Sequence, residues 1–182
     1  MKELALHLLD LVENSAKAGA SCISVAVHED LGSDVLSFSV KDDGCGMDAE
    51  FLERVRDPFT TSKPKVTGLG IPFLCQAAEQ AGGFVDIASV VDKGTTVHAV
   101  WKHSHWDRAP LGQMAETVTA FFAMPCRIVF DHRIVDQTGA AVWQLELDSH
   151  DFGGTPLDAG TLAALKEFLD VQYQEGRKWV NQ

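Results

Sequence analysis

Two polar side chains stand one helical turn apart near the start of the chain. Asp10 and Asn14 lie within residues 3–18, where leucine and valine recur at helical spacing until Gly19 ends the run. Residues four apart share one face of a helix, so this carboxylate and this amide would lie side by side. Their oxygens could hold a hard cation together with water. A solvated helix face is the alternative, and the spacing alone does not decide between the two.

A glycine-rich turn follows the alternating segment at residues 35–41 and reads Asp42-Asp43-Gly44-Cys45-Gly46. Glycine lets the backbone approach a ligand closely. A carboxylate at the end of a strand could accept a hydrogen bond from an exocyclic amine such as that of adenine. A tight turn without a ligand would show the same residues, so this pattern is also open when taken alone.

A second glycine segment, Thr67-Gly68-Leu69-Gly70, precedes a predicted helix that extends to about residue 81. Exposed amides at a helix N-terminus bind anions, and Lys63 and Lys65 stand in the loop just before them. The alternative is an ordinary helix start after a loop. Further along, Gly94-Thr95 begins a predicted strand and on its own indicates only a turn.

The elements around these residues follow from apolar periodicity. Alternation predicts strands at residues 21–28, 35–41, 84–91 and 95–101, and a short helix is expected near 48–55. Together with the opening helix and the helix at 68–81, this order is typical of an α+β fold, with helices on one face of a mostly antiparallel sheet.

The remaining chain is predicted to form a small α+β C-terminal extension. A polar joint at 103–109 leads to a helix at about 110–123, a hairpin of strands 127–135 and 141–148, and a final helix at about 161–180. We therefore expect two domains, residues 1–102 and residues 103–182. No catalytic constellation stands in the second, which we interpret as a docking or dimerisation element.

Composition narrows the function classes. The net charge is −11, and no basic patch could follow a phosphate backbone, which argues against nucleic-acid binding. The four cysteines are scattered without a CxxC pair, as expected for free thiols in a reducing cytosol. No apolar run is long enough to cross a membrane, and the acidic opening segment is unlike a signal peptide. We expect a cytoplasmic protein.

Taken in order, these motifs resemble the GHKL, or Bergerat-fold, ATPases, a superfamily that includes histidine kinases, gyrases, chaperones and mismatch-repair ATPases. The resemblance covers residues 4–101 and implies an α/β sandwich that binds ATP and Mg²⁺. The segments that carry it are Leu11–Ala20 (N box), Asp42–Gly46 (G1 box), Asp57–Lys63 (F box), Gly68–Gly70 (G2 box), and Gly82-Gly83 followed by Gly94-Thr95.

The resemblance implies a role for each matching residue. Asn14 would coordinate magnesium, Asp42 would bind the adenine amine with help from Thr95, and Lys63 or Lys65 would approach the phosphates. In the hydrolysing families a glutamate stands where this chain has Asp10, whose reach is one methylene shorter, and Glu13 is the alternative base. Two boxes depart from the pattern, at Val66 and Asp92. The other predicted nucleotide contacts are Lys17, Gly44, Gly46, Met47, Thr67, Gly68, Leu69 and Gly70.

Three functions fit these expectations: a kinase-like regulator of a partner protein, a slow ATPase whose nucleotide state gates partner binding, and a non-catalytic nucleotide sensor. The chain begins almost at the N-box helix, so we do not expect a self-contained sensor kinase, nor His7 to be a phosphoacceptor. A looser resemblance, carried by residues 69–73, 106–112 and the extension, is to stand-alone ATP-binding proteins of iron-only hydrogenase systems. It implies a partner or regulator role, with a hydrogenase or another redox system as the candidate for the protein partner. The extension, as a docking or dimerisation element, would also allow a homodimer.

Overall fold

The computed structural model describes residues 3–55 and 70–180. Leucine and valine at helical spacing produce the opening helix, and alternation produces the strands, so most elements begin and end close to the predicted residues. The helices are α1 (Leu4–Lys17), α2 (Ala49–Arg54), α3 (Gly70–Gln80), α4 (Met114–Phe122) and α5 (Ala159–Val180), with a 3₁₀ turn at Ser149–Phe152; the strands are β1 (Cys22–Asp30), β2 (Val35–Asp42), β3 (Phe84–Val90), β4 (Gly94–Lys102), β5 (Arg127–Val135) and β6 (Ala141–Asp148).

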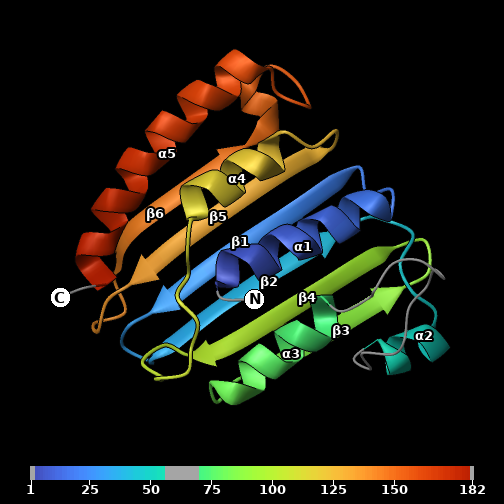
Figure 1. The fold of residues 1–182 in the computed structure, drawn as a ribbon, viewed down its shortest axis with the longest axis horizontal. Coiled ribbons are helices and arrows are strands. Elements are labelled where there is room, and N and C mark those ends of the chain that lie inside the picture. The colour runs from blue at the N-terminus through green and yellow to red at the C-terminus, as the bar shows by residue number, and fades with distance from the viewer. Residues whose placement is uncertain (1–2, 56–69, 181–182) are drawn as a thin grey trace.

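All six strands form one sheet in the order β3-β4-β2-β1-β5-β6 (Figure 1). Every neighbouring pair is antiparallel except β1 and β5, which run parallel with Cys22 opposite Arg127. The sheet is therefore mostly antiparallel, as predicted. The parallel pair joins β1, near the start of the chain, to β5, which begins about a hundred residues later.

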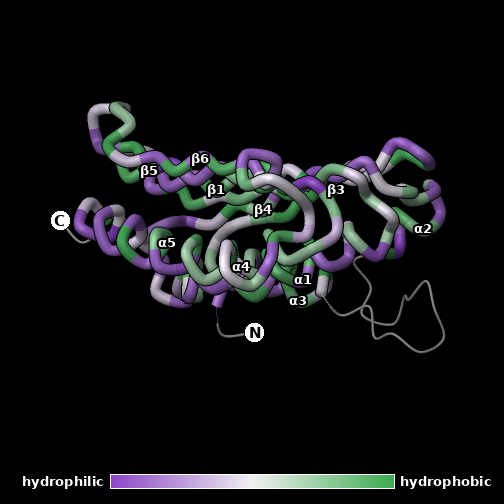
Figure 2. Tube along the Cα trace, turned by 90° about the horizontal axis from the view of Figure 1, so that it is seen from above, coloured by the Kyte–Doolittle hydropathy of each residue, from purple (hydrophilic) through white to green (hydrophobic). Residues whose placement is uncertain are grey.

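The helices α1, α3, α4 and α5 lie on one face of this sheet, as Figure 2 shows. Each strand turns alternate residues toward the helices. The largest fully buried side chains, among them Trp101, Phe38 and Phe130, fill the space between the layers. The rings of Phe38 and Trp101 are tilted, with centroids 4.8 Å apart. The predicted α+β class, with helices on one face of the sheet, is confirmed.

The extension continues the sheet and does not form a separate layer. β5 pairs with β1 along their whole length, and α4 packs beside α1. The core cluster contains Leu8 and Val25 from the first segment together with Phe121 and Phe130 from the second. The sheet and core are thus continuous across the predicted boundary at residues 102 and 103, and the division into two domains stays a prediction.

One helix begins later than expected. Residues 110–123 were predicted as helical, but α4 begins at Met114. The carbonyl oxygens of Pro110 and Leu111 instead accept hydrogen bonds from the backbone N–H groups of Leu4 and Ala5, at 3.0 and 2.9 Å. These two N–H groups belong to the first turn of α1, which has no partner for them within the helix. The segment just before α4 therefore caps α1.

A buried polar cluster ties the joint and the extension to β1. Glu29, at the end of β1, is 5% exposed, and its two carboxylate oxygens each lie 3.0 Å from a histidine Nε2, of His103 and of His132. The Nδ1 atom of His132 lies 3.3 Å from the hydroxyl oxygen of Tyr173 on α5. Hydrogen bonds from the two histidines hold the pKa of Glu29 at about 2, although burial opposes this shift.

No helix within residues 3–55 and 70–180 is both long enough and apolar enough to traverse a lipid bilayer.

Candidate functional site

The predicted adenine-binding carboxylate, Asp42, is fixed by three donors. Its Oδ1 atom accepts backbone N–H hydrogen bonds from Gly44 at 2.9 Å and from Thr95 at 3.2 Å. Its Oδ2 atom accepts a hydrogen bond from the hydroxyl of Ser15 at 2.8 Å. Asp42 is 8% exposed and Ser15 is 6% exposed, so these bonds are shielded from bulk water. A carboxylate oxygen can accept two hydrogen bonds, and Oδ2 has capacity for a second donor.

The hydroxyl of Ser89 holds two strands and a loop together beside Asp42. Its oxygen accepts a hydrogen bond from the backbone N–H of Met47 at 2.8 Å and lies 2.9 Å from the hydroxyl oxygen of Thr95. It lies 3.1 Å from the carbonyl oxygen of Gly94. Thr95 and Met47, both predicted as nucleotide contacts, are therefore positioned by one side chain on β3.

Three of the predicted glycines stand where backbone segments nearly touch. A Cβ atom on Gly46 would lie 2.1 Å from the carbonyl oxygen of Val90, and one on Gly94 would lie 1.9 Å from that of Asp42. Both residues also have positive φ angles, of 65° and 93°. A Cβ atom on Gly44 would lie 3.0 Å from the carbonyl oxygen of Ala18 at the end of α1. The turn after β2 thus closes against both α1 and the β3–β4 hairpin.

Asp43, the second aspartate of this turn, bonds to a different part of the chain. One carboxylate oxygen of Asp43 accepts the backbone N–H groups of Ser21 at 2.8 Å and Cys22 at 2.9 Å, and the other accepts the Ser21 hydroxyl. The Ser21 hydroxyl makes the largest contribution to the lowered pKa of Asp43. Asp43 therefore fastens the turn to the start of β1. The carbonyl of Ser21 in turn accepts the backbone N–H of Arg127, the first residue of β5, at 3.0 Å.

Asp10 and Asn14 lie side by side on α1, as their spacing predicts. The Asn14 side-chain amide donates to Asp10 Oδ2 at 3.3 Å. The same carboxylate lies against the first residue of α3, because a Cβ atom on Gly70 would stand 1.7 Å from Asp10 Oδ2. Desolvation is the largest cause of the raised pKa of Asp10. The fold thus brings together a carboxylate and a helix start that are sixty residues apart in sequence.

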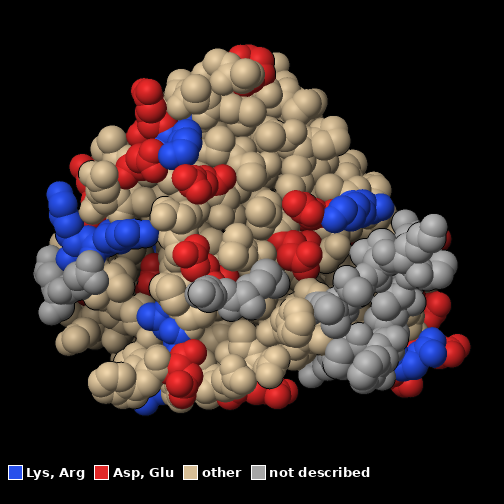
Figure 3. All heavy atoms as spheres, in the orientation of Figure 1, with Lys and Arg blue, Asp and Glu red and all other residues tan. Residues whose placement is uncertain are grey.

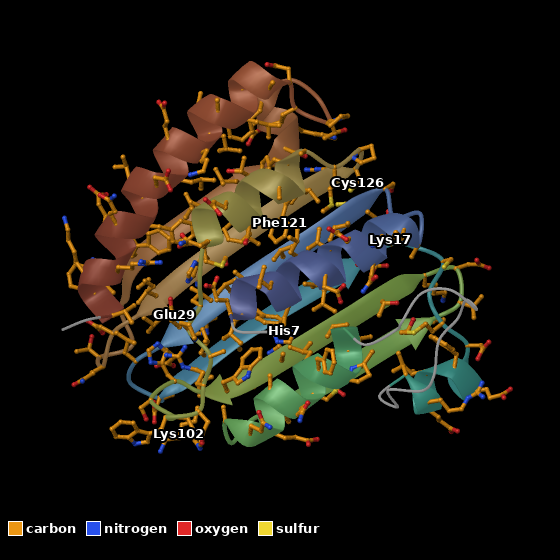
Figure 4. All side chains as sticks on the ribbon, in the orientation of Figure 1. His7, Lys17, Glu29, Lys102, Phe121 and Cys126 are labelled. Carbon is orange, nitrogen blue, oxygen red and sulfur yellow. The ribbon has the colours of Figure 1, made fainter. Side chains whose placement is uncertain are left out.

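The two remaining N-box residues face solvent. Lys17 and Glu13 form an ion pair of 3.0 Å one turn apart, with side chains 64% and 45% exposed. Figure 4 shows Lys17 at the end of α1, at the opposite end of the molecule from Glu29. Neither side chain contacts Asp42 in a hydrogen bond among those found within residues 3–55 and 70–180. Their predicted roles depend on a ligand being present.

Four predicted contacts, Lys63, Thr67, Gly68 and Leu69, lie outside the described residues, as do Lys65 and Val66.

His7 lies one turn before Asp10 on α1 but points into the protein. It is 2% exposed, and neither ring nitrogen has a hydrogen-bond partner in the described part of the chain. Burial is the main reason that its pKa falls to about 4. An uncharged histidine packed between helices agrees with the expectation that His7 is not a phosphoacceptor.

Sequence reasoning missed Ser15 and Ser89. Ser15 is adjacent to Asn14 and stands on the buried side of α1, where a serine hydroxyl needs a partner. The buried position of Ser15 indicated that its hydroxyl has a partner, but that partner, Asp42, is 27 residues away in the sequence. Ser89 lies in an alternating strand and carried no local signal.

One hollow of the described surface lies away from these residues. A surface hollow of about 330 Å³ is lined by Asp34, Phe84 and Lys102, at the other ends of β2, β3 and β4 from Asp42. Lys102 and Asp34 face each other there, with 3.7 Å between Nζ and Oδ2. None of the predicted nucleotide contacts that the structure describes lines it.

Comparison with known proteins identifies the family of the chain. The family model for histidine kinase-, DNA gyrase B- and HSP90-like ATPases matches residues 2–105, which is more than half of the chain. The chain belongs to this ATPase family. Membership confirms the predicted resemblance and supports ATP binding and a kinase-like function.

Known proteins that resemble this chain include two sensor kinases. It is 37% identical over 95 residues to the sensor histidine kinase ZraS of Klebsiella oxytoca, which is 52% of this chain and 20% of that protein. It is 42% identical over 66 residues to the sensor kinase CckA of Brucella abortus, or 35% of this chain and 7% of that protein. The matched segments are thus a minor part of each kinase.

A solved structure supports the fold over a longer stretch. The N-terminal domain of a DNA repair protein aligns with 80% of this chain and 53% of its own, with a TM-score of 0.50 and 16% sequence identity. At this identity the likeness concerns the fold alone.

The described residues fit the ligands that the ATPase family implies. Asp42 offers a fixed, buried acceptor, and a Cβ atom on Gly44 would lie 3.1 Å from its Oδ1 atom. Within residues 3–55 and 70–180 no cluster of three His, Cys, Asp or Glu side chains could hold a metal ion. Magnesium usually takes one or two protein ligands together with phosphates and water, and the Asn14 amide oxygen could be one of these.

Proposed function

We propose that this chain binds ATP with magnesium at the site around Asp42 and acts as a nucleotide-switched, kinase-like regulator of a partner protein. The observation that carries the proposal is the buried Asp42 carboxylate, held by Ser15, Gly44 and Thr95 with capacity for one further donor on Oδ2. An adenine amine is such a donor, and a carboxylate acceptor would disfavour guanine, which presents a carbonyl at the equivalent position.

Asn14 and Asp10 are assigned to the phosphate end of the site. Bound magnesium would supply positive charge that stabilises the transferring phosphoryl group. Asn14 would present its amide oxygen to the ion, because its Nδ2 already donates to Asp10. Asp10 would accept a proton from an attacking water or hydroxyl, and its raised pKa brings it closer to the range of a general base. Glu13, paired with Lys17, is the alternative base.

Two other functions remain as alternatives. A slow ATPase would use Asp10 to activate water and would change partner binding with nucleotide state. A sensor would use Asp10 only to hold the start of α3, a role that its contact with Gly70 favours. The partner is proposed to be a protein. The proposal that this partner belongs to a redox system such as a hydrogenase rests on sequence resemblance alone. A cytoplasmic location is likewise a proposal.

The test uses γ-labelled ATP incubated with the full chain, alone and with cell lysate. A labelled protein supports the kinase-like function, free phosphate supports the ATPase, and intact ATP with retained binding supports the sensor. Asp10→Asn should keep ATP binding and lose turnover; equal phosphate release by this variant and the wild type would exclude Asp10 as the base.

Binding itself is tested by isothermal titration calorimetry. Asn14→Ala should weaken magnesium-ATP binding at least about a hundredfold, since it removes a metal ligand. Gln144→Ala, an amide on β6 far from Asp42, is the matched control and should leave the affinity unchanged. Unaltered affinity in Asn14→Ala would contradict the assignment of the metal ligand.

A further inference from the structure

Ser89, on β3, has a partner for every hydrogen bond that its hydroxyl can make. A serine hydroxyl has one proton to donate and two lone pairs with which to accept. The backbone N–H of Met47 donates to its oxygen at 2.8 Å, and the carbonyl oxygen of Gly94 lies 3.1 Å from it. The hydroxyl oxygen of Thr95 is the third neighbour, at 2.9 Å.

Only one arrangement of protons makes all three of these hydrogen bonds. The carbonyl of Gly94 can only accept, so it takes the proton of Ser89. The N–H of Met47 donates to one lone pair of Ser89, and the contact with Thr95 then needs the proton of Thr95. The Thr95 hydroxyl therefore donates to Ser89, and only lone pairs are left on it for a ligand.

Ser89, Thr95 and Asp42 stand side by side on three neighbouring strands. Ser89 is opposite Thr95 in the register of β3 and β4, and the backbone N–H of Thr95 donates to Asp42 at the end of β2. Side chains alternate along a strand, so Ser89 is on the helix-facing side of β3 with the buried Val85. Thr95 is on the same side of β4 as the buried Val97. An ionised carboxylate also can only accept, so two acceptors lie next to each other at this end of the sheet.

The charge of the surrounding surface does not favour one nucleotide over another. Figure 3 shows acidic side chains spread over the helix-bearing face and basic ones in separate groups. The described residues of this face therefore do not form one broad positive area that would attract every triphosphate. Discrimination between nucleotides then depends on the groups that meet the base.

We propose, on the basis of the ATP binding proposed above, that Ser89 is a positioning residue that makes the site selective for a 6-aminopurine. By taking the proton of Thr95, it leaves Thr95 and Asp42 as two acceptors on neighbouring strands. An exocyclic amine brings two protons and suits both acceptors. A 6-oxo purine brings a carbonyl oxygen, which meets lone pairs on both sides. Ser89 acts through Thr95 and does not itself touch the base.

The test compares ATP with inosine triphosphate, which has a carbonyl oxygen in place of the 6-amino group, by calorimetric titration of the full chain. The ratio of the two dissociation constants measures the selectivity. Ser89→Ala frees the proton of Thr95 to meet the 6-oxygen, so the selectivity should fall by at least about fivefold, the effect of one hydrogen bond. A merely structural role for Ser89 would weaken both nucleotides equally, and an unchanged ratio would overturn the proposal.

A double-variant cycle tests whether Ser89 acts through Thr95. Thr95→Val removes the hydroxyl itself, and in that background Ser89→Ala should not change the ratio further. Ser89→Thr retains a hydroxyl and should keep the selectivity of the wild type. Additive effects of the two substitutions, or a threonine variant that behaves like alanine, would count against the proposal.

Two more variants separate this role from loss of the fold. Ser39→Ala removes a hydroxyl from the face of β2 opposite the buried Phe38 and Val40, and should keep the wild-type ratio. Ser89→Cys keeps the size of the side chain but offers only a weak donor and acceptor, so it should lower the selectivity even if the alanine variant does not fold. A wild type that binds neither nucleotide would contradict the proposed function itself. Tight ATP binding with a ratio that neither Ser89 variant alters would contradict only the role of Ser89.

Discussion

At the scale of single residues, the site depends on the hydroxyl of Ser15, although we assign it no contact with ATP or magnesium. Ser15 donates to Asp42 Oδ2 from the neighbouring helix, and both groups are buried. This bond orients the carboxylate and satisfies one of its lone pairs. A free carboxylate at this position would rotate or attract water, so Ser15 should contribute to adenine recognition without touching the base.

Ser15→Ala should therefore weaken ATP binding by about tenfold or more, the effect of losing one hydrogen bond to a buried charged group. Calorimetric titration with ATP measures this. Ser24→Ala removes an exposed serine on β1 and serves as the control. The role given to Ser15 would be wrong if both variants bound ATP equally well.

Residue types and spacing predicted much of this site. Asp10 and Asn14 share a helix face, and Asp42 and Thr95 meet, as the motifs indicated. The links from Ser15 to Asp42 and from Ser89 to Thr95 were not predictable, because they join segments whose relative placement depends on the packed sheet. The bonds from Asp43 to the start of β1 were likewise not predictable from the motif.

At the scale of elements, the cluster around Glu29 fastens four segments to one another. Glu29 on β1 is bonded to His103 in the joint and His132 on β5, and His132 contacts Tyr173 on α5. Its pKa of about 2 is below the ordinary 4.5. This cluster therefore stabilises the fold fully above pH 4.5, and its contribution is lost as pH falls from 4.5 toward 2.

Glu29→Gln should lower the free energy of unfolding by about 2 kcal/mol at pH 7, since an amide cannot accept from both histidines. The difference from the wild type should shrink between pH 4.5 and pH 2.5, where the wild-type carboxylate begins to lose its advantage. Urea unfolding at each pH measures both effects. Asp86→Asn, on the exposed side of β3, should change little. A difference that does not depend on pH would refute the ionic role.

Periodicity placed the elements well because each stripe of apolar residues reports a locally buried face. It failed at the start of α4, where Pro110 and Leu111 cap α1 and are not helical. It also could not reveal that β5 lies beside β1, since parallel partners leave no turn between them in the sequence.

At the scale of the whole molecule, the first hundred residues and the extension share one sheet and one core. A chain that ends after Lys102 would lose the neighbour of β1 and the helix that covers α1. We expect it to unfold without a cooperative transition and to associate through the bare edge of β1. Differential scanning calorimetry and light scattering test this. Cooperative melting with normal ATP affinity would instead establish residues 1–102 as an independent domain.

The parallel pairing of β1 with β5 also determines when the sheet can be completed during synthesis on the ribosome. The two strands are separated by about a hundred residues, which a ribosome adds in roughly 5–20 s. Throughout that interval β1 lacks its parallel partner, and we expect the chain made so far not to fold cooperatively. A chaperone could therefore bind the nascent chain before β5 is added to the sheet.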